Sequence, residues 1–176
     1  MATKDYFLKI EGIEGESQDS KHKGEIDIES FSWGESNPVV YGSLGDKRKV
    51  TMEEIHFTMF ASKASTKLMR ACASPSDQTI PKATFTLRKA GGDQQEYLIF
   101  TFLDVRVTSY KIAGPATETS RHEQIGHEKN ENPLPLEQIT LNFGEMEVEY
   151  RSQKSVGDLG GKNKFKYNLK KAQLMS

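Results

Sequence analysis

Two histidines in a charged stretch are the first residues of this chain that could bind a metal ion. His122 and His127 each precede a glutamate. They are five residues apart, so they do not share one face of a helix, and the spacing of the HExxH zinc motif is not met. The stretch from Gly114 to Pro135 is polar, charged and without periodicity. We therefore interpret it as a solvated loop and predict no metal site.

Cys72 is the single cysteine and could act as a nucleophile with His56 as its base. A catalytic thiol needs neighbours that lower its pKa, and the residues around Cys72 offer none. A free cysteine more often serves as a small buried apolar group. We therefore place Cys72 on the inner face of a helix. A single cysteine also excludes an internal disulfide and a cysteine-based zinc site.

Three further segments could bind or turn over a ligand. The run Gly42–Gly45 is neither a GxSxG elbow nor a Walker A loop, because no Gly-Lys-Ser/Thr follows it. Lys47-Arg48-Lys49 could contact phosphate, but a solvated or partner-facing charge run is the more typical reading. Phe31 and Trp33 could stack on a ligand ring, although strand aromatics more often belong to a core or an interface. The sequence thus predicts no catalytic residues, no cofactor and no enzyme.

The composition limits the remaining classes. A chain of 176 residues suits one domain, here residues 1–176, because domains commonly contain about 100–200 residues. Its 24 Lys and Arg residues balance 25 Asp and Glu residues, giving a formal net charge of −1. Proteins that bind nucleic acid usually carry a strong basic excess, so that class is disfavoured.

The chain start, Met1 to Phe7, lacks the long apolar core of a signal peptide. No segment approaches the roughly 18 uninterrupted apolar residues of a membrane span. We expect a cytoplasmic protein without membrane insertion. Any export must use a route that does not read signal peptides.

Alternating apolar and polar residues predict a mainly β fold. The expected strands cover Tyr6–Ile13, Glu25–Trp33, Ile55–Met59, Ala83–Leu87, Tyr97–Tyr110, Ile139–Phe143, Met146–Tyr150 and, near the C-terminus, about 164–170. A helix is predicted over Ser62–Ala73, started by Ser62 or Ser65 and stopped by Pro75, with Leu68 and Cys72 facing inward. The Pro- and Gly-containing stretch at about 35–49 reads as an extended loop.

The alternation slips by one residue at two places, near Glu29-Ser30 and at Gly144-Glu145. Such a slip turns every later side chain to the other face, so we predict a β-bulge at each place. Bulges let a sheet curl. The expected fold is an open β-barrel of two packed antiparallel sheets with one flanking α-helix.

The sequence also resembles a known family. The motifs that carry the likeness are Phe7–Ile10, Gly15-Glu16-Ser17, Asp19, His22, Glu25-Ile26, Ser32-Trp33-Gly34, Phe60–Ser65, Lys82–Gly92, Glu96–Ile99, Asp104–Ser109 and Glu137–Phe143. In this order and spacing they resemble the haemolysin-coregulated protein family, Hcp, over almost the whole chain. The charged loop Thr117–Asn132 and the tail beyond Ser152 differ from the shorter members.

This resemblance implies a structural subunit of the type VI secretion tube. Members form hexameric rings with a wide channel, and the rings stack into a tube below a spike protein of the VgrG type. Contraction of the surrounding sheath drives the tube out of the cell, and small secreted effectors travel in the channel with the subunit as their chaperone. The alternatives are a monomeric barrel-type binding module of the cytosol and an unrecognised enzyme that uses His56 or Cys72.

Within an Hcp-like ring, two sets of residues become site candidates. Ser32 lies between Phe31 and Trp33, so it faces the opposite side of its strand and is a candidate for the channel lining; an ordinary exposed serine is the alternative. The loop residues Ser43, Leu44, Gly45, Asp46, Lys47 and Arg48 are candidates for contact with the next ring. An exposed loop without a partner is the alternative there.

Overall fold

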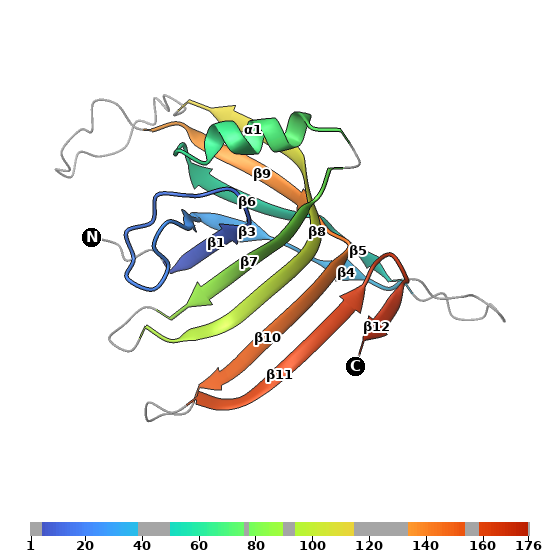
Figure 1. The fold of residues 1–176 in the computed structure, drawn as a ribbon. Helices are drawn as coiled ribbons and strands as arrows, with labels where there is room; N and C mark the ends of the chain where they lie inside the picture. Colours follow the sequence, from blue (N-terminus) through green and yellow to red (C-terminus); the bar gives the residue numbers. More distant parts are fainter. Residues whose placement is uncertain are drawn as a thin grey trace, which may run out of the picture.

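The strands of this protein bury one face each in a shared apolar core, as their alternation requires. The structure is a computed structural model, and it describes residues 5–38, 50–75, 78–89, 94–114, 134–153 and 159–175. These residues form two antiparallel sheets and one helix (Figure 1). The sheets curl toward each other without closing, so the fold is the open barrel that the sequence predicts.

Sheet A is the larger of the two and lies in front in Figure 1. Its order is β12 (Gln173–Met175), β11 (Leu159–Asn168), β10 (Glu145–Gln153), β8 (Glu96–Ala113), β7 (Ile80–Arg88), β1 (Tyr6–Ile10) and β2 (Ile26–Asp27). In β7, Ala83, Phe85 and Leu87 are buried, as predicted.

Sheet B consists of the second half of β8, β9 (Leu136–Asn142), β6 (Ile55–Phe60) and β3 (Ser30–Ser32). A separate two-stranded ribbon pairs β4 (Glu35–Ser36) with β5 (Thr51–Met52). Sheet A and sheet B are joined because β8 runs through both. Its first half pairs with β7 and β10, and its second half pairs with β9.

The turn of β8 from one sheet into the other is visible in its backbone. Asp104 has a positive φ of 52°, and the register with β9 shifts between Val107 and Ser109. A register shift of this kind bends a strand and increases its twist. Strand β8 is therefore continuous and bends from sheet A into sheet B.

The prediction of a β-bulge is wrong at both places. The chain crosses from one sheet to the other there instead. Ile28 donates its backbone N–H to Tyr6 in sheet A, at 3.0 Å, whereas the next residue, Glu29, donates to Thr58 in sheet B, at 2.8 Å. Gly144 lies between β9 of sheet B and β10 of sheet A and donates to Leu103, at 2.9 Å. The parity slips in the sequence mark these crossings.

Helix α1 spans Ser65–Ala73, three residues shorter at its start than predicted. Ala64 occupies the N-cap position without a side-chain cap, and the Ser65 hydroxyl instead accepts the backbone N–H of Ser62 at 2.9 Å. Neither serine caps the helix as expected. Leu68 is fully buried, and Cys72 is half-buried against the core, so the predicted inner face is confirmed.

An aromatic cluster ties the two sheets together around Phe85. Its ring lies 4.8 Å from the centroids of both Phe31 and Phe57, with Tyr6 beyond at 6.3 Å. Edge-to-face pairs at such distances add about 0.5–1.5 kcal/mol each beyond the burial of their area. Phe31 and Trp33 therefore belong to the core packing and not to a ligand site.

The strand predicted at about 164–170 is β11. It spans Leu159–Asn168, so it begins and ends earlier than predicted, and it pairs with β10 along its length. Three short strands were missed: β12, and the β4–β5 ribbon at the base of the predicted loop. Within the described ranges, no helix is both long and apolar enough to cross a lipid bilayer.

Candidate assembly surfaces

The outward face of sheet B carries two rows of mostly polar side chains, one of which starts at Ser32. Ser32 is exposed while Phe31 and Trp33 pack against the core, as the alternation predicted. Register places Ser32 opposite His56, His56 opposite Thr140, and Thr140 opposite Ser109. A second row joins Ser30, Thr58, Gln138 and Lys111. We call these two rows the polar face of sheet B.

His56 is fixed on this polar face by a neighbour from the next strand. Its Nδ1 lies 2.9 Å from the Thr140 hydroxyl oxygen. Ile55 and Phe57 on either side of His56 are buried, so sheet B separates His56 from the core. Cys72 packs against that core from under α1. The structure therefore does not bring His56 and Cys72 together, and the nucleophile–base pair cannot form.

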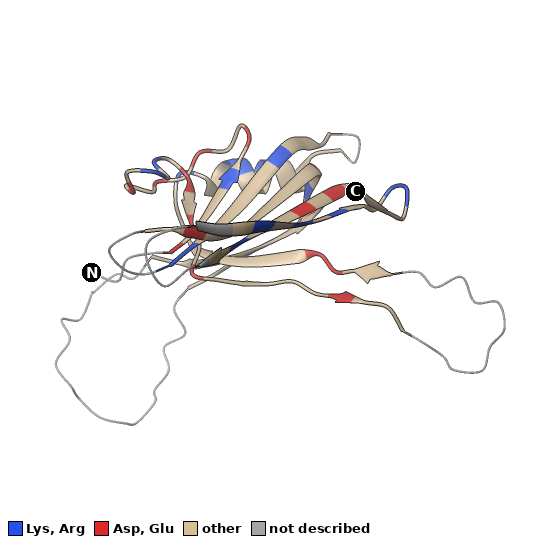
Figure 2. Cartoon of the chain, turned by 90° about the horizontal axis from the view of Figure 1, so that it is seen from below, with Lys and Arg blue, Asp and Glu red and all other residues tan. Residues whose placement is uncertain are grey.

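The described residues on either side of the ring-stacking candidates form a paired ribbon, β4–β5. Ser43, Leu44, Gly45, Asp46, Lys47 and Arg48 lie outside the described residues. The β4–β5 ribbon leads toward them and extends away from the body of the barrel (Figure 2). The Trp33 indole N–H donates to the Glu53 carbonyl at 3.0 Å, and the Glu53 N–H donates to the Gly34 carbonyl at 2.9 Å. These bonds anchor the ribbon to the core.

A buried charge cluster holds the turn between β1 and β2 on the end of sheet A. Arg88, whose side chain is 2% exposed, pairs with Asp19 at 2.8 Å and lies over the Phe7 ring. The His22 ring stacks on Phe7, and its Nδ1 lies 2.9 Å from a Glu25 carboxylate oxygen. The sequence analysis missed this cluster beyond the motif likeness, because Arg88 is distant in sequence from Phe7, Asp19, His22 and Glu25.

The ionisation of Asp19 reflects this cluster. Burial acts to raise the pKa of Asp19, but the Lys21 backbone N–H and the Arg88 guanidinium outweigh it, and the pKa lies below its ordinary value. Asp19 is therefore charged in the folded protein down to lower pH than a free carboxyl. Its negative charge compensates the buried cation of Arg88.

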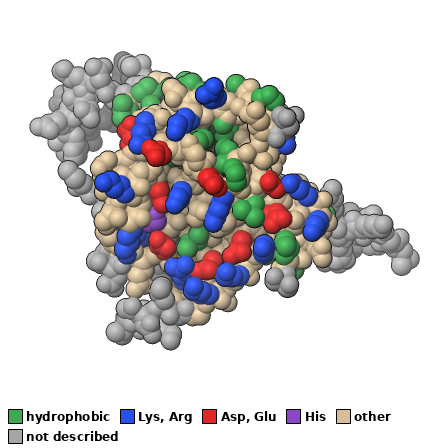
Figure 3. Space-filling view, in the orientation of Figure 1, with side chains coloured by type: hydrophobic (Ala, Val, Ile, Leu, Met, Phe, Trp, Pro, Cys, Tyr) green, Lys and Arg blue, Asp and Glu red, His purple; other side chains and the backbone are tan. Residues whose placement is uncertain are grey.

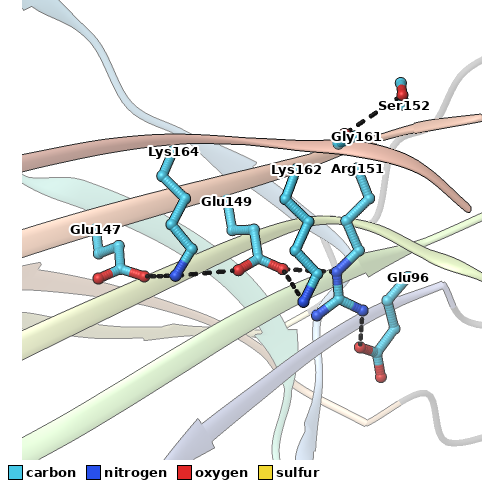
Figure 4. A network of polar contacts seen from close by, with 8 residues as sticks. All are labelled: Glu96, Glu147, Glu149, Arg151, Ser152, Gly161, Lys162 and Lys164. Carbon is cyan, nitrogen blue, oxygen red and sulfur yellow. Dashed lines mark hydrogen bonds and ion pairs between the residues drawn. The ribbon is translucent and has the colours of Figure 1, made fainter.

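The outer face of sheet A carries Lys and Arg side chains interleaved with Asp and Glu (Figure 3). Between β10 and β11, Lys164 bridges Glu147 at 3.0 Å and Glu149 at 3.4 Å (Figure 4). Arg151 binds Glu149 at 2.7 Å and reaches Glu96 at 3.6 Å. The Arg151 hydrogen bond lowers the pKa of Glu149, and Glu147 raises the pKa of Lys164. This network binds the last long strand to sheet A.

The described residues hold no group of three or more His, Cys, Asp and Glu side chains that could bind a metal ion. The two histidines considered first, His122 and His127, lie outside the described residues.

Comparison with known proteins identifies the family. The model of the family described as "Type VI secretion system effector, Hcp" matches residues 7–150. The chain belongs to the Hcp family. It is 36% identical to the protein hcp1 of Pseudomonas aeruginosa over 170 residues, which cover 94% of this chain and 95% of that protein.

Solved Hcp structures share the fold. The crystal structure of Hcp1 from Salmonella typhimurium is 31% identical, has a TM-score of 0.72, and is matched over 97% of this chain and 98% of its own. A structure described as a type six secretion system protein has a TM-score of 0.80 at 27% identity, over 97% and 99% of the two chains. The chain is therefore a β-rich type VI secretion tube protein of the Hcp type.

Proposed function

We propose that this protein forms hexameric rings that stack into the type VI secretion tube, and that small effectors travel in the ring channel. The observation that carries the proposal is that sheet B has two different free edges. Among the described residues, β3 pairs only with β6, and the second half of β8 pairs only with β9. Unpaired strand edges are templates for pairing with another chain.

Two different edges suit a ring. A head-to-tail contact repeats one interface around an axis and closes when the rotation per subunit is right. If the β3 edge of one subunit meets the β8 edge of the next, sheet B continues from subunit to subunit. The polar face of sheet B then forms a continuous inner wall with Ser32 on it.

The character of that face supports a channel. Its side chains are mostly small and uncharged, namely Ser30, Ser32, Thr58, Gln138, Thr140 and Ser109, with His56 and Lys111. These two rows offer hydrogen bonds to varied cargo, and the next row on the same face is apolar, with Phe60, Leu136 and Ala113. The remaining partners of the proposal are a VgrG-type spike, the contractile sheath and the effectors themselves.

We also propose that the protein works without catalysis or a cofactor, and that it is cytoplasmic before firing and then secreted. The separation of His56 from Cys72 supports the first point. Membership of the Hcp family supports the second.

The test is the mass of the purified protein in solution. Light scattering at micromolar concentration should give about six times the 19.8 kDa of one chain. A stable monomer would contradict the ring and favour the alternative, a monomeric barrel-type binding module.

A further inference from the structure

A hollow lies beside helix α1, and one of its lining residues, Arg106, pairs with Asn142 on β9 of sheet B. Its volume is about 370 Å³, and α1, the turn after β1 and the middle of β8 line it. Ile13, Val105 and Val107 are buried and provide an apolar floor. Lys67, Arg70 and Arg106 are exposed and line the rim.

The arginines on this rim differ from the other described arginines in their contacts. Four arginines fall within the described residues, and two of them, Arg88 and Arg151, bind carboxylates. Arg70 and Arg106 make no side-chain hydrogen bond or ion pair within the part of the chain that the structure describes, and both line this hollow. Among the described residues, Lys67 donates only to the Gly12 carbonyl, at 3.2 Å.

A local role explains only part of this arrangement. Arg70 lies in the last turn of α1, where a cation compensates the negative end of the helix dipole. Arg106 lies on β8 and has no such role. Among the described residues, Glu11 is the single acidic one that lines the hollow, so their rim has an excess of positive charge. In Figure 3, Lys and Arg side chains gather over the region of α1 at the top of the view.

We propose that this hollow binds an acidic segment of a partner protein. Arginine forks bind carboxylates through two parallel hydrogen bonds, which are stronger than neutral ones. The apolar floor can contact an apolar side chain that lies next to the acidic residue of a bound peptide. Inorganic phosphate and a free carboxylate carry no such side chain. The combination of charged rim and apolar floor thus fits a peptide with alternating acidic and apolar residues. The proposal uses neither the β3 edge nor Ser32, but Arg106 lies on the half of β8 whose free edge the ring proposal uses. The mass of each variant in solution is therefore measured together with its peptide affinity, so that loss of rings and loss of the site can be told apart.

The experiment measures the fluorescence anisotropy of a labelled peptide that alternates Glu and Leu, with a Lys-Leu peptide as the opposite-charge probe. The Glu-Leu peptide should bind the purified protein and weaken as salt rises. The Arg70→Glu/Arg106→Glu variant should lose at least about tenfold in affinity, as expected for charge-assisted hydrogen bonds. Arg106→Gln alone should lose several-fold while leaving the helix untouched.

The matched control is Lys89→Glu/Lys171→Glu, which changes the net charge equally. Both lysines are exposed and lie outside the lining of this hollow. The control should bind the peptide within about twofold of the unchanged protein, as surface substitutions away from a site do. Equal loss in both variants would show general charge attraction and overturn the site. Unchanged binding by Arg106→Gln, or equal displacement by inorganic phosphate, would also overturn it.

Discussion

Ser32 combines exposure with a fixed position in a row of small polar side chains. Changing Ser32 to Gln adds bulk on the polar face of sheet B and leaves Phe31 and Trp33 in the core. We expect rings of normal mass, with reduced binding or export of effectors carried in the channel. Co-purification of an effector with the variant measures this loss.

The matched control for Ser32→Gln is Thr66→Gln, which adds similar bulk on the exposed surface of α1. It should leave effector binding unchanged. If Ser32→Gln prevents ring assembly, Ser32 belongs to a subunit interface and does not line the channel.

Leu68 is the main side chain that fixes α1 to the barrel, since it is fully buried. Leu68→Ala should lower the free energy of unfolding by about 2–5 kcal/mol, because it removes buried methyl groups and leaves a cavity. Denaturant unfolding measures the change. Met69→Ala, at a neighbour that is 40% exposed, should change the free energy by less than about 0.5 kcal/mol. A similarly small change for Leu68→Ala would contradict the packing.

Asp19 gives a pH-dependent contribution to stability. The pKa of Asp19 in the folded protein lies below the ordinary value of 3.8. The full contribution of Asp19 to the free energy of unfolding is therefore present above pH 3.8, and it is lost as the pH falls through the folded pKa. Asp19→Asn should cost about 3 kcal/mol at pH 7, as for a buried pair that loses one partner.

The difference between Asp19→Asn and the unchanged protein should shrink below about pH 4, where Asp19 begins to take up a proton. Unfolding at several pH values measures it. Asp27→Asn is the control, because Asp27 forms no ion pair in the described structure. A pH-independent difference would show that the Asp19 charge does not stabilise the fold.

For single residues, the sequence predicts which way a side chain faces but not which residue it contacts. Alternation with apolar neighbours was enough to place Ser32 outward, and helical spacing was enough to place Leu68 inward. It could not pair Asp19 with Arg88, or His56 with Thr140, because these contacts join strands far apart along the chain. Only the fold brings such residues together.

Among the elements, the β4–β5 ribbon has the clearest predicted role. It is anchored by the bonds between Trp33, Gly34 and Glu53 and leads outward to the stacking candidates. Deleting Ser43–Lys47 should leave ring mass unchanged and impair tube assembly, measured by light scattering and by pelleting of tubes. Unchanged secretion of the variant would contradict a role of the loop between rings.

The elements that the sequence predicts well are the long ones. Strands such as β7 and β10 contain enough alternating residues to define a period. The strands β4, β5 and β12 have only two or three residues, which is too few for any period to show. The N-cap of α1 was missed for another reason, since Ser62 and Ser65 bond to the turn before the helix.

At the scale of the whole molecule, the sequence correctly predicts an open barrel with one flanking helix. The parity slips at residues 29 and 144 show where the buried side chains switch to the other face of the strand. The structural cause of each slip depends on which strand the following segment pairs with. The switch from Tyr6 to Thr58 as hydrogen-bond partner shows that the chain changes sheets there. Pairing between distant strands is a property of the folded chain, which local periodicity does not contain.

The pairing of β6 with β9 has a consequence for the protein while it is being made. Ile55 pairs with Leu141, and Phe60 pairs with Leu136. At a synthesis rate of about 5–20 residues per second, β6 leaves the ribosome roughly 4–16 s before its partner. During this interval the nascent chain has Phe57 and Met59 exposed to water, although both are buried in the finished barrel. β6 therefore lacks this strand partner until β9 has left the ribosome.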